Sequence, residues 1–223
     1  SYYDRMCEVD HSVCYLWIAQ IFSGRSLGDL RGHIADMMDL GGTIQAPMPN
    51  GEHKTVPVPR LFPAQIELMH WLQANGVDVW IVSAALEEMV RMVASDPKYG
   101  LELAPERVIG VNLMLEPSDG NPTVGAMERS QGKDGTEYYF SEERMKWTLT
   151  AYPFAPLTWY GGKVAAIQEW IHPSQRPVLV AGDSPNDFYM QFYVDVENAG
   201  VRLRIHRKDS HKQKLLIEQQ RRI

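Results

Sequence analysis

The stretch Val178-Leu-Val-Ala-Gly-Asp-Ser-Pro-Asn-Asp-Phe-Tyr-Met190 decides the fold of this sequence. Its first four residues are apolar without alternation, which predicts a strand buried on both faces of a parallel sheet. Gly182 permits a sharp turn after this strand, and the carboxylates of Asp183 and Asp187 follow. Ligands of open α/β sheets bind at the carboxyl ends of strands, and oxygen ligands there suit Mg²⁺. The alternative is that Asp183 only caps the next helix.

The bulk composition is that of an ordinary globular protein. The chain has 223 residues, of which 44% are hydrophobic and 22% charged, enough for one large α/β domain or a core with a smaller insert. A formal net charge of −6 argues against a general nucleic-acid binder. No apolar run approaches the roughly 20 residues that span a bilayer. The basic residues of 202–222 are mixed with acidic ones and indicate a solvated surface.

The two cysteines, Cys7 and Cys14, do not make a disulfide framework. On one continuous helix they would stand about 10 Å apart along its axis, beyond bridging distance. We therefore expect buried free thiols, unless the helix breaks between them. His11 alone does not complete a zinc site. The chain begins without an initiator Met or a signal peptide, in what resembles the middle of a helix, so we expect the natural protein to extend further upstream.

The first sixty residues predict helices and then an irregular connection. Apolar residues recur at helical spacing over 14–22, and Gly24 ends this helix. Ser26 and Asp29 form a capping-box-like start for a second helix. Two short amphipathic helices suggest an αα-hairpin that lies over another part of the protein. The proline-rich stretch 46–59 predicts a linker or hinge.

From residue 62 the pattern alternates between helix and strand, which is typical of α/β proteins. We predict helices and strands in turn over 62–75, 77–82, 86–93 and 108–113. Turn dipeptides predict an insertion of loops and hairpins over 116–158, with strands at 136–140 and 146–151. A helix then follows Gly161, residues 201–205 alternate as a last half-exposed strand, and a polar helix ends the chain.

Ser83 and Lys163 have the features of an anion site. Ser83 ends a predicted strand, where its hydroxyl and the following amides, beginning with Ala84, can hold an anionic oxygen. The alternatives are a plain helix cap and a nucleophilic serine, for which a Gly-x-Ser-x-Gly elbow is absent. Lys163 starts a helix whose dipole opposes its charge unless an anion is near. A surface lysine is the alternative, but paired glycines before it permit close approach to a ligand.

In this order and spacing, the motifs resemble those of phosphatases of the haloacid dehalogenase superfamily. Ser83 is similar to the second motif of that family, Lys163 to the third, and Asp183 with Asp187 to the fourth. The resemblance implies a three-layer, Rossmann-like α/β core with a mostly parallel sheet. It assigns 1–60 to a helical cap, 61–206 to the core with the 116–158 insertion, and 207–223 to a C-terminal helix or tail.

The resemblance also implies an activity, hydrolysis of a small phosphorylated metabolite through an aspartyl-phosphate. It implies Mg²⁺ held by Asp183 and Asp187, with Asp187 binding a metal-bound water or orienting Lys163. Ser83, Ala84 and Lys163 would hold the phosphoryl group, and Ser83, Lys163 and Asp187 would serve catalysis. No nucleic-acid or membrane partner is expected, and the oligomeric state stays open.

One motif of the family is absent from this sequence. Asp-x-Asp-x-Thr, which carries the family's nucleophile and its general acid/base, does not occur in these 223 residues. Asp36 and Asp39 lie on an amphipathic helix and follow no apolar strand. We expect the motif upstream of residue 1. The alternatives are a non-catalytic, anion-binding homologue and a structural cap-and-core pair that works only with a partner chain.

A narrower resemblance is to the bacterial phosphorylcholine phosphatase group. It rests on Ser83-Ala-Ala85 with Glu87-Glu88 following, and on the aromatic-rich segment 7–17. It implies choline as product and a periplasmic location, with the cytoplasm as the alternative. Aromatic faces and a carboxylate bind quaternary ammonium groups; the candidates are Glu8, Asp10 and Trp17, with Tyr2, Tyr3 and Tyr15. The alternatives are an ordinary aromatic core and a phosphoserine phosphatase-like enzyme.

Overall fold

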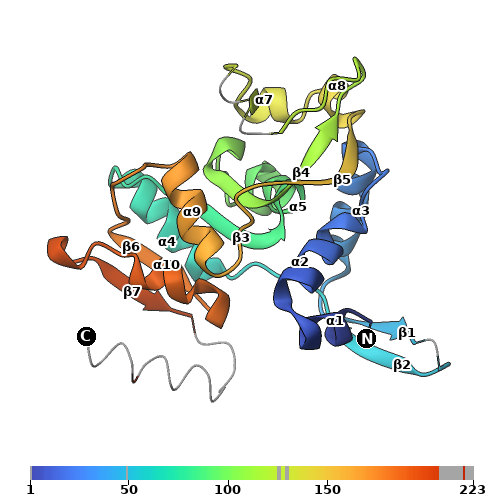
Figure 1. Ribbon diagram of the computed structural model, residues 1–223, viewed down its shortest axis with the longest axis horizontal. Coiled ribbons are helices and arrows are strands. Elements are labelled where there is room, and N and C mark those ends of the chain that lie inside the picture. The colour runs from blue at the N-terminus through green and yellow to red at the C-terminus, as the bar shows by residue number, and fades with distance from the viewer. Residues whose placement is uncertain (1, 49, 125–126, 129–130, 206–217, 219–223) are drawn as a thin grey trace.

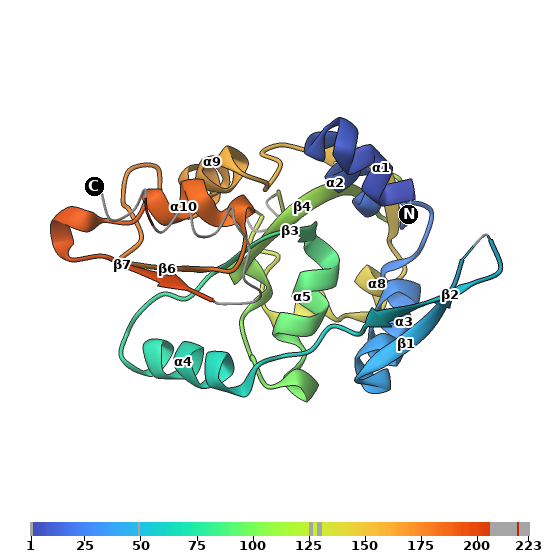
Figure 2. The same cartoon turned by 90° about the horizontal axis from the view of Figure 1, so that it is seen from below.

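The computed structural model describes residues 2–48, 50–124, 127–128, 131–205 and 218 (Figure 1). It is an α/β protein, as the alternating pattern predicts. In the strand-rich part, α9 (Gly161–Trp170) and α10 (Phe188–Phe192) lie on one side of the strands. The helices α4 (Pro63–Ala74) and α5 (Glu87–Ser95) lie on the other side (Figure 2). No helix in the described part of the chain is long and apolar enough to cross a membrane. The polar C-terminal helix predicted after 205 lies outside the described residues, except for residue 218.

Within the residues that the structure describes, the strands form three separate hydrogen-bonded groups. These groups are an antiparallel pair, a three-stranded group with the order β3-β4-β5, and a parallel pair. In the second group β3 and β4 are parallel, whereas β4 and β5 are antiparallel. The strands are β1 (Thr43–Pro47), β2 (His53–Pro57), β3 (Ile81–Leu86), β4 (Val108–Glu116), β5 (Thr148–Phe154), β6 (Leu179–Gly182) and β7 (Val201–Arg204).

The helices confirm most of the predicted periodicity. They are α1 (Tyr2–Val9), α2 (His11–Gln20), α3 (Leu27–Leu40), α4 (Pro63–Ala74), α5 (Glu87–Ser95), α7 (Thr136–Tyr139), α8 (Glu142–Met145), α9 (Gly161–Trp170) and α10 (Phe188–Phe192). Short 3₁₀ turns η1 (Pro97–Tyr99), η2 (Pro105–Arg107), η3 (Pro185–Asp187) and η4 (Val196–Asn198) connect them. The predicted cap of α3 is present, because the side chain of Ser26 accepts a hydrogen bond from the Asp29 N–H at 3.0 Å.

The main hydrophobic core joins the first sixty residues to the strands. Leu27 and Leu30 of α3 are completely buried and belong to the same cluster as Leu113 of β4 and Leu149 of β5. Burial of each such leucine contributes roughly 1.5–3 kcal/mol relative to exposure. The helix α3 is therefore packed into the same core as β4 and β5.

The predicted linker over 46–59 is wrong, because this segment forms most of an antiparallel ribbon. β1 and β2 pair from Thr43 with Pro57 to Pro47 with His53. Gly51 takes a positive φ of 82° in the turn, so Asn50-Gly51 is the hairpin signal that the prolines concealed. Pro47 and Pro57 stand at strand ends, where a missing N–H is tolerated.

The expectation of free thiols is also wrong, because Cys7 and Cys14 form a disulfide. The helix breaks at Asp10, which has an extended backbone with φ −163° and ψ 136°. Its carboxylate accepts the Ser12 N–H at 2.7 Å and so caps α2. This break brings the two Cα atoms within 5.1 Å. Aspartate is a preferred N-cap residue, so Asp10 was the signal for this break.

Three further boundaries differ from prediction. Residues 136–139 form the helix α7, not a strand. The strand expected over 77–82 starts later, at Ile81, so Ser83 lies within β3. Val178 is 51% exposed and only Val180 of β6 is buried. The prediction that this strand is buried on both faces is therefore wrong within the described residues. Among the strands that the structure describes, none pairs with the second edge of β3 or of β6.

Candidate active site

A buried ion pair joins the separate motifs. Lys163, in the first turn of α9, is only 5% exposed. Its Nζ lies 2.7 Å from Oδ1 of Asp187 and donates a second hydrogen bond of 2.7 Å to the carbonyl oxygen of Val82. A buried ammonium is stable only when it is paired. Lys163 is therefore not a surface lysine; it connects α9, β3 and the loop after β6.

The other oxygen of Asp187 organises that loop. Oδ2 accepts hydrogen bonds from the Asp183 N–H at 3.1 Å, the Ser184 N–H at 3.0 Å and the Ser184 hydroxyl at 3.0 Å. A Cβ at Gly182 would stand 2.5 Å from the Cβ of Asp187, so only glycine fits there. Both carboxylate oxygens of Asp187 are thus engaged by the protein itself.

Ser83 is held beside this ion pair by its main chain. Its carbonyl accepts a hydrogen bond of 2.5 Å from the hydroxyl of the buried Thr158. Its side-chain oxygen accepts the Ala85 N–H at 3.1 Å across Ala84. The residue that precedes α5 is Leu86, so Ser83 does not cap that helix. The pairing of β3 with β4 is irregular between Val82 and Leu86, which leaves this segment outside the regular ladder.

The paired glycines before Lys163 have a different explanation from the one expected. A Cβ at Gly162 would stand 1.8 Å from the carbonyl oxygen of Leu157, so this glycine permits close packing of the preceding loop. A Cβ at Gly161 would meet no atom within 4 Å. Packing against Leu157 is therefore enough to explain Gly162, and the interpretation that the paired glycines make room for a ligand stays a prediction.

The oxygen donors that a magnesium ion would need are only partly present among the described residues. Asp183 is half-buried at the carboxyl end of β6. Mg²⁺ commonly takes one or two protein carboxylates together with waters and a phosphate oxygen. Within the described ranges, no three His, Cys, Asp or Glu side chains converge to hold a metal. Asp183 therefore fits as one ligand, and a complete site needs donors from outside these residues.

The residues expected to bind an ammonium group are only partly brought together. Tyr2 and Trp17 pack edge to face, with ring centroids 5.5 Å apart. Glu8 is exposed on α1. The carboxylate of Asp10 is engaged in capping α2. The aromatic residues thus form a pair on α1 and α2, and Asp10 has a structural partner.

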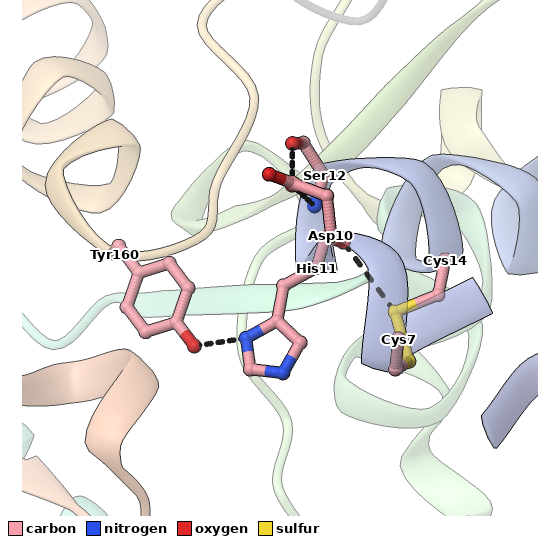
Figure 3. Close-up of a disulfide and its surroundings, with 6 residues drawn as sticks. All are labelled: Cys7, Asp10, His11, Ser12, Cys14 and Tyr160. Carbon is pink, nitrogen blue, oxygen red and sulfur yellow. Dashed lines mark hydrogen bonds between the residues drawn. A yellow bond between two sulfur atoms is a disulfide. The ribbon is translucent and has the colours of Figure 1, made fainter. Parts of the chain in front are cut away.

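A second group of site residues had no recognisable sequence signal. The hydroxyl of Tyr160 hydrogen bonds to Nδ1 of His11, and the two rings stack with centroids 5.7 Å apart (Figure 3). The N–H of Tyr160 donates to Oδ1 of Asn186 at 3.0 Å. Burial and the neighbouring Tyr15 raise the pKa of Tyr160, so its hydroxyl is neutral at physiological pH. No motif or periodicity marks these positions.

A separate buried cluster of charges holds the insertion to α5. Arg144, 1% exposed, lies 3.1 Å from Glu88 and 2.9 Å from Glu128. Tyr139 donates to Glu88 at 2.8 Å. Burial alone would raise the pKa of Glu88, but the charges of Arg144 and Arg91 outweigh it and lower that pKa. Through these ion pairs and hydrogen bonds, residues of the insertion contact Glu88 of α5.

The first comparisons, with family models and with solved structures, bear on the fold. No family model matches the chain. It resembles the crystal structure of a conserved functionally unknown protein from Anaerococcus prevotii with a TM-score of 0.62. The identity is 22%, over 90% of this chain and 48% of that one, so this likeness shows a shared fold alone.

The second comparison is with a curated protein. The chain is 41% identical over 220 residues to the phosphorylcholine phosphatase of Pseudomonas aeruginosa. The match covers 96% of this chain and 61% of that protein, so the chain spans about three fifths of its relative. The resemblance to the phosphorylcholine phosphatase group is thereby confirmed, and the chain is a relative of that phosphatase.

Proposed function

We propose that the whole protein is a phosphoric monoester hydrolase of the haloacid dehalogenase type. The observation that carries this proposal is the convergence of three motifs on one buried ammonium group. Lys163 Nζ reaches both the carbonyl of Val82, next to Ser83, and Asp187, which organises the Asp183 loop, at 2.7 Å each. The phosphatase relative supports the same activity.

The described residues would bind and orient the phosphoryl group. Lys163 provides the positive charge, and Asp187 holds its ammonium in place. The Ser83 hydroxyl and the main chain at Ala84 would donate to phosphoryl oxygens, because β3 leaves its regular ladder there. Ground-state binding and transition-state stabilisation by such preorganised donors are typical of phosphoryl transfer.

The nucleophile would come from a strand upstream of residue 1. The second edges of β3 and β6 have no strand partner among the described residues, and both strands are parallel to their one neighbour. An added parallel strand between them would join the two groups into the mostly parallel, three-layer core that the resemblance implies. Its carboxyl end would lie beside Ser83 and Asp183, where the Asp-x-Asp-x-Thr motif is required.

The chemistry would then proceed in two displacements. A carboxylate oxygen of the first upstream aspartate forms a bond to phosphorus while the bond to the leaving oxygen breaks. The second aspartate gives its proton to that leaving oxygen and later takes one from the water that hydrolyses the aspartyl-phosphate. Mg²⁺, held by Asp183 and the upstream aspartate, would neutralise phosphoryl charge. Asp187 would act mainly by orienting Lys163 and the loop.

The substrate that we favour is phosphorylcholine. The name of the relative supports it, and so do the paired aromatic residues Tyr2 and Trp17 and the exposed carboxylate of Glu8 on α1. An aromatic face and a carboxylate suit a quaternary ammonium. The engagement of Asp10 in capping α2 argues for a structural role of this residue, with Glu8 and Trp17 as the substrate contacts. The Cys7–Cys14 disulfide supports an oxidising compartment such as the periplasm.

We expect the full-length protein to prefer phosphorylcholine over phosphoserine and glycerol phosphate by about 30-fold in kcat/KM. This factor corresponds to about 2 kcal/mol from a desolvated cation–π contact. Phosphate release from the three substrates under identical conditions measures it, with p-nitrophenyl phosphate as a check of active enzyme. Equal values of kcat/KM would remove the choline preference, and a preference for phosphoserine would favour the phosphoserine phosphatase-like alternative.

A second candidate function is a non-catalytic protein that binds anions. The observation in its favour is the ammonium of Lys163, which is buried and held by Asp187 at 2.7 Å and can attract an anion without a nucleophile. The sequence upstream of residue 1 discriminates the two. An apolar strand that ends in Asp-x-Asp-x-Thr supports the enzyme, and a different sequence supports the binding protein.

A further inference from the structure

Tyr160 has a backbone conformation that residues other than glycine rarely adopt. It precedes α9 with φ 49° and ψ −123°, a region that glycine occupies with little cost. Gly161 and Gly162 follow directly, yet the positive φ falls on the tyrosine. A non-glycine residue persists in such a conformation when its surroundings hold it there, and this occurs most often at functional sites.

The side chain of Tyr160 contacts α2. Its hydroxyl hydrogen bonds to Nδ1 of His11, and its ring stacks on the imidazole at an interplanar angle of 19° (Figure 3). The hydroxyl also interacts with Tyr15, one turn further along α2. Trp159 continues the contact, because its ring centroid lies 5.9 Å from that of Tyr15.

The main chain of Tyr160 contacts the proposed phosphate site. Its N–H donates to Asn186, which lies inside the loop from Asp183 to Asp187. Its carbonyl accepts the N–H of Lys163 at 3.2 Å. One residue therefore touches α2, the start of α9 and the aspartate loop.

The α2 side of this contact is itself fixed in place. His11 is the first residue of α2, directly after the capping residue Asp10. The Cys7–Cys14 disulfide spans both residues and ties α1 to α2 across the break. His11 is thus held at the position where it meets Tyr160.

We propose that Tyr160 is a positioning residue that holds α1 and α2 in register with the Lys163 phosphate site and so selects the leaving group. The inference rests on the proposed phosphatase function. Residues on α1 and α2 contact the leaving group, and Lys163 holds the phosphate. Tyr160 sets the position of one relative to the other.

The test compares three variants of the full-length protein. Tyr160→Phe removes the hydroxyl contact, Tyr160→Gly removes the whole side chain but accommodates the positive φ, and Tyr152→Phe changes an exposed tyrosine as control. The first readout is the ratio of kcat/KM for phosphorylcholine to that for p-nitrophenyl phosphate. We expect Tyr160→Phe to lower this ratio about tenfold, through KM for phosphorylcholine, and Tyr160→Gly to lower it further. The control should keep the wild-type ratio.

A second readout does not depend on activity. Hydrogen exchange of residues 11–15 should become about fivefold faster in Tyr160→Phe, and in wild-type protein after reduction of the disulfide, while β4 stays protected. An unchanged ratio together with unchanged exchange would overturn the inference. Equal losses of kcat for both substrates would also overturn it, because they indicate a general structural role. If wild-type protein hydrolyses neither substrate, the proposed function fails, and the exchange of residues 11–15 alone decides whether Tyr160 holds α2.

Discussion

Asp183→Asn should lower Mg²⁺-dependent hydrolysis of p-nitrophenyl phosphate by the full-length protein about a thousandfold. The amide keeps the size of the side chain but loses the charge that a hard cation requires. The hydrogen bond from the Asp183 main chain to Asp187 does not involve the altered group, so the loop should keep its conformation. Initial rates over a range of Mg²⁺ concentrations, with circular dichroism and Tm as measures of folding, test this expectation.

Asp78→Asn is the matched control for this variant. Its carboxylate is 77% exposed and pairs with Arg107 at the surface. We expect near-wild-type rates, because an exposed ion pair contributes only about 0–1 kcal/mol to stability and lies outside the proposed site. Near-normal turnover in Asp183→Asn, with the fold intact, would contradict the proposed metal ligand.

Arg144→Met should produce the largest loss of stability outside the apolar core. Removal of Arg144 leaves Glu128 buried without the guanidinium that it pairs with, and leaves Glu88 with Arg91, at a cost of about 3–5 kcal/mol. For a chain of this length that corresponds to a fall in Tm of about 10 °C. Urea unfolding of the wild type and the variant gives the difference in free energy.

Lys146→Met serves as control, because Lys146 pairs with Glu143 on the surface with both side chains more than 60% exposed. It should change stability by less than about 0.5 kcal/mol. Equal effects of the two variants would show that burial does not decide the strength of these pairs.

The stability of Arg144→Met should also depend on pH. In the wild type the lowered pKa of Glu88 gives stability above its ordinary value of about 4.3, which is lost as the pH falls through the folded-state pKa. Without Arg144, the charge of Arg91 remains, but the effect of burial is less offset and the pKa of Glu88 should rise. The difference in the free energy of unfolding between wild type and variant should therefore become smaller as the pH falls from about 7 to about 4.

Features that depend on local chemistry were predictable from the sequence. The Ser26 cap and the spacing of apolar residues determine helix positions through neighbouring residues alone. The order of Ser83, Lys163 and Asp187 on α/β elements predicted their common site, because strand ends and helix starts meet at one edge of such sheets. The ion pair between Lys163 and Asp187 agrees with that prediction.

Features that depend on contacts distant in sequence were not predictable in this way. The burial of Glu88 and Arg144 arises from a contact across 56 positions, and each residue alone resembles a surface charge. The contact of His11 with Tyr160 spans 149 positions. The disulfide can form only because the helix breaks at Asp10, where the backbone is extended. The prediction of free thiols assumed one continuous helix and therefore placed the two cysteines too far apart. The strand β3 begins at Ile81, where its pairing with β4 begins. Val77 is as apolar as the paired residues, so the sequence alone could not show where the strand starts.

The central claim is that the Lys163 site belongs to a phosphomonoesterase. Phosphate release from phosphorylcholine by the full-length wild-type protein, with Mg²⁺ and after its removal by EDTA, tests it most directly. We expect saturable release of phosphate that requires Mg²⁺ and returns when Mg²⁺ is restored. Binding of inorganic phosphate without release from phosphorylcholine or any other phosphomonoester would contradict it and identify an anion-binding protein instead.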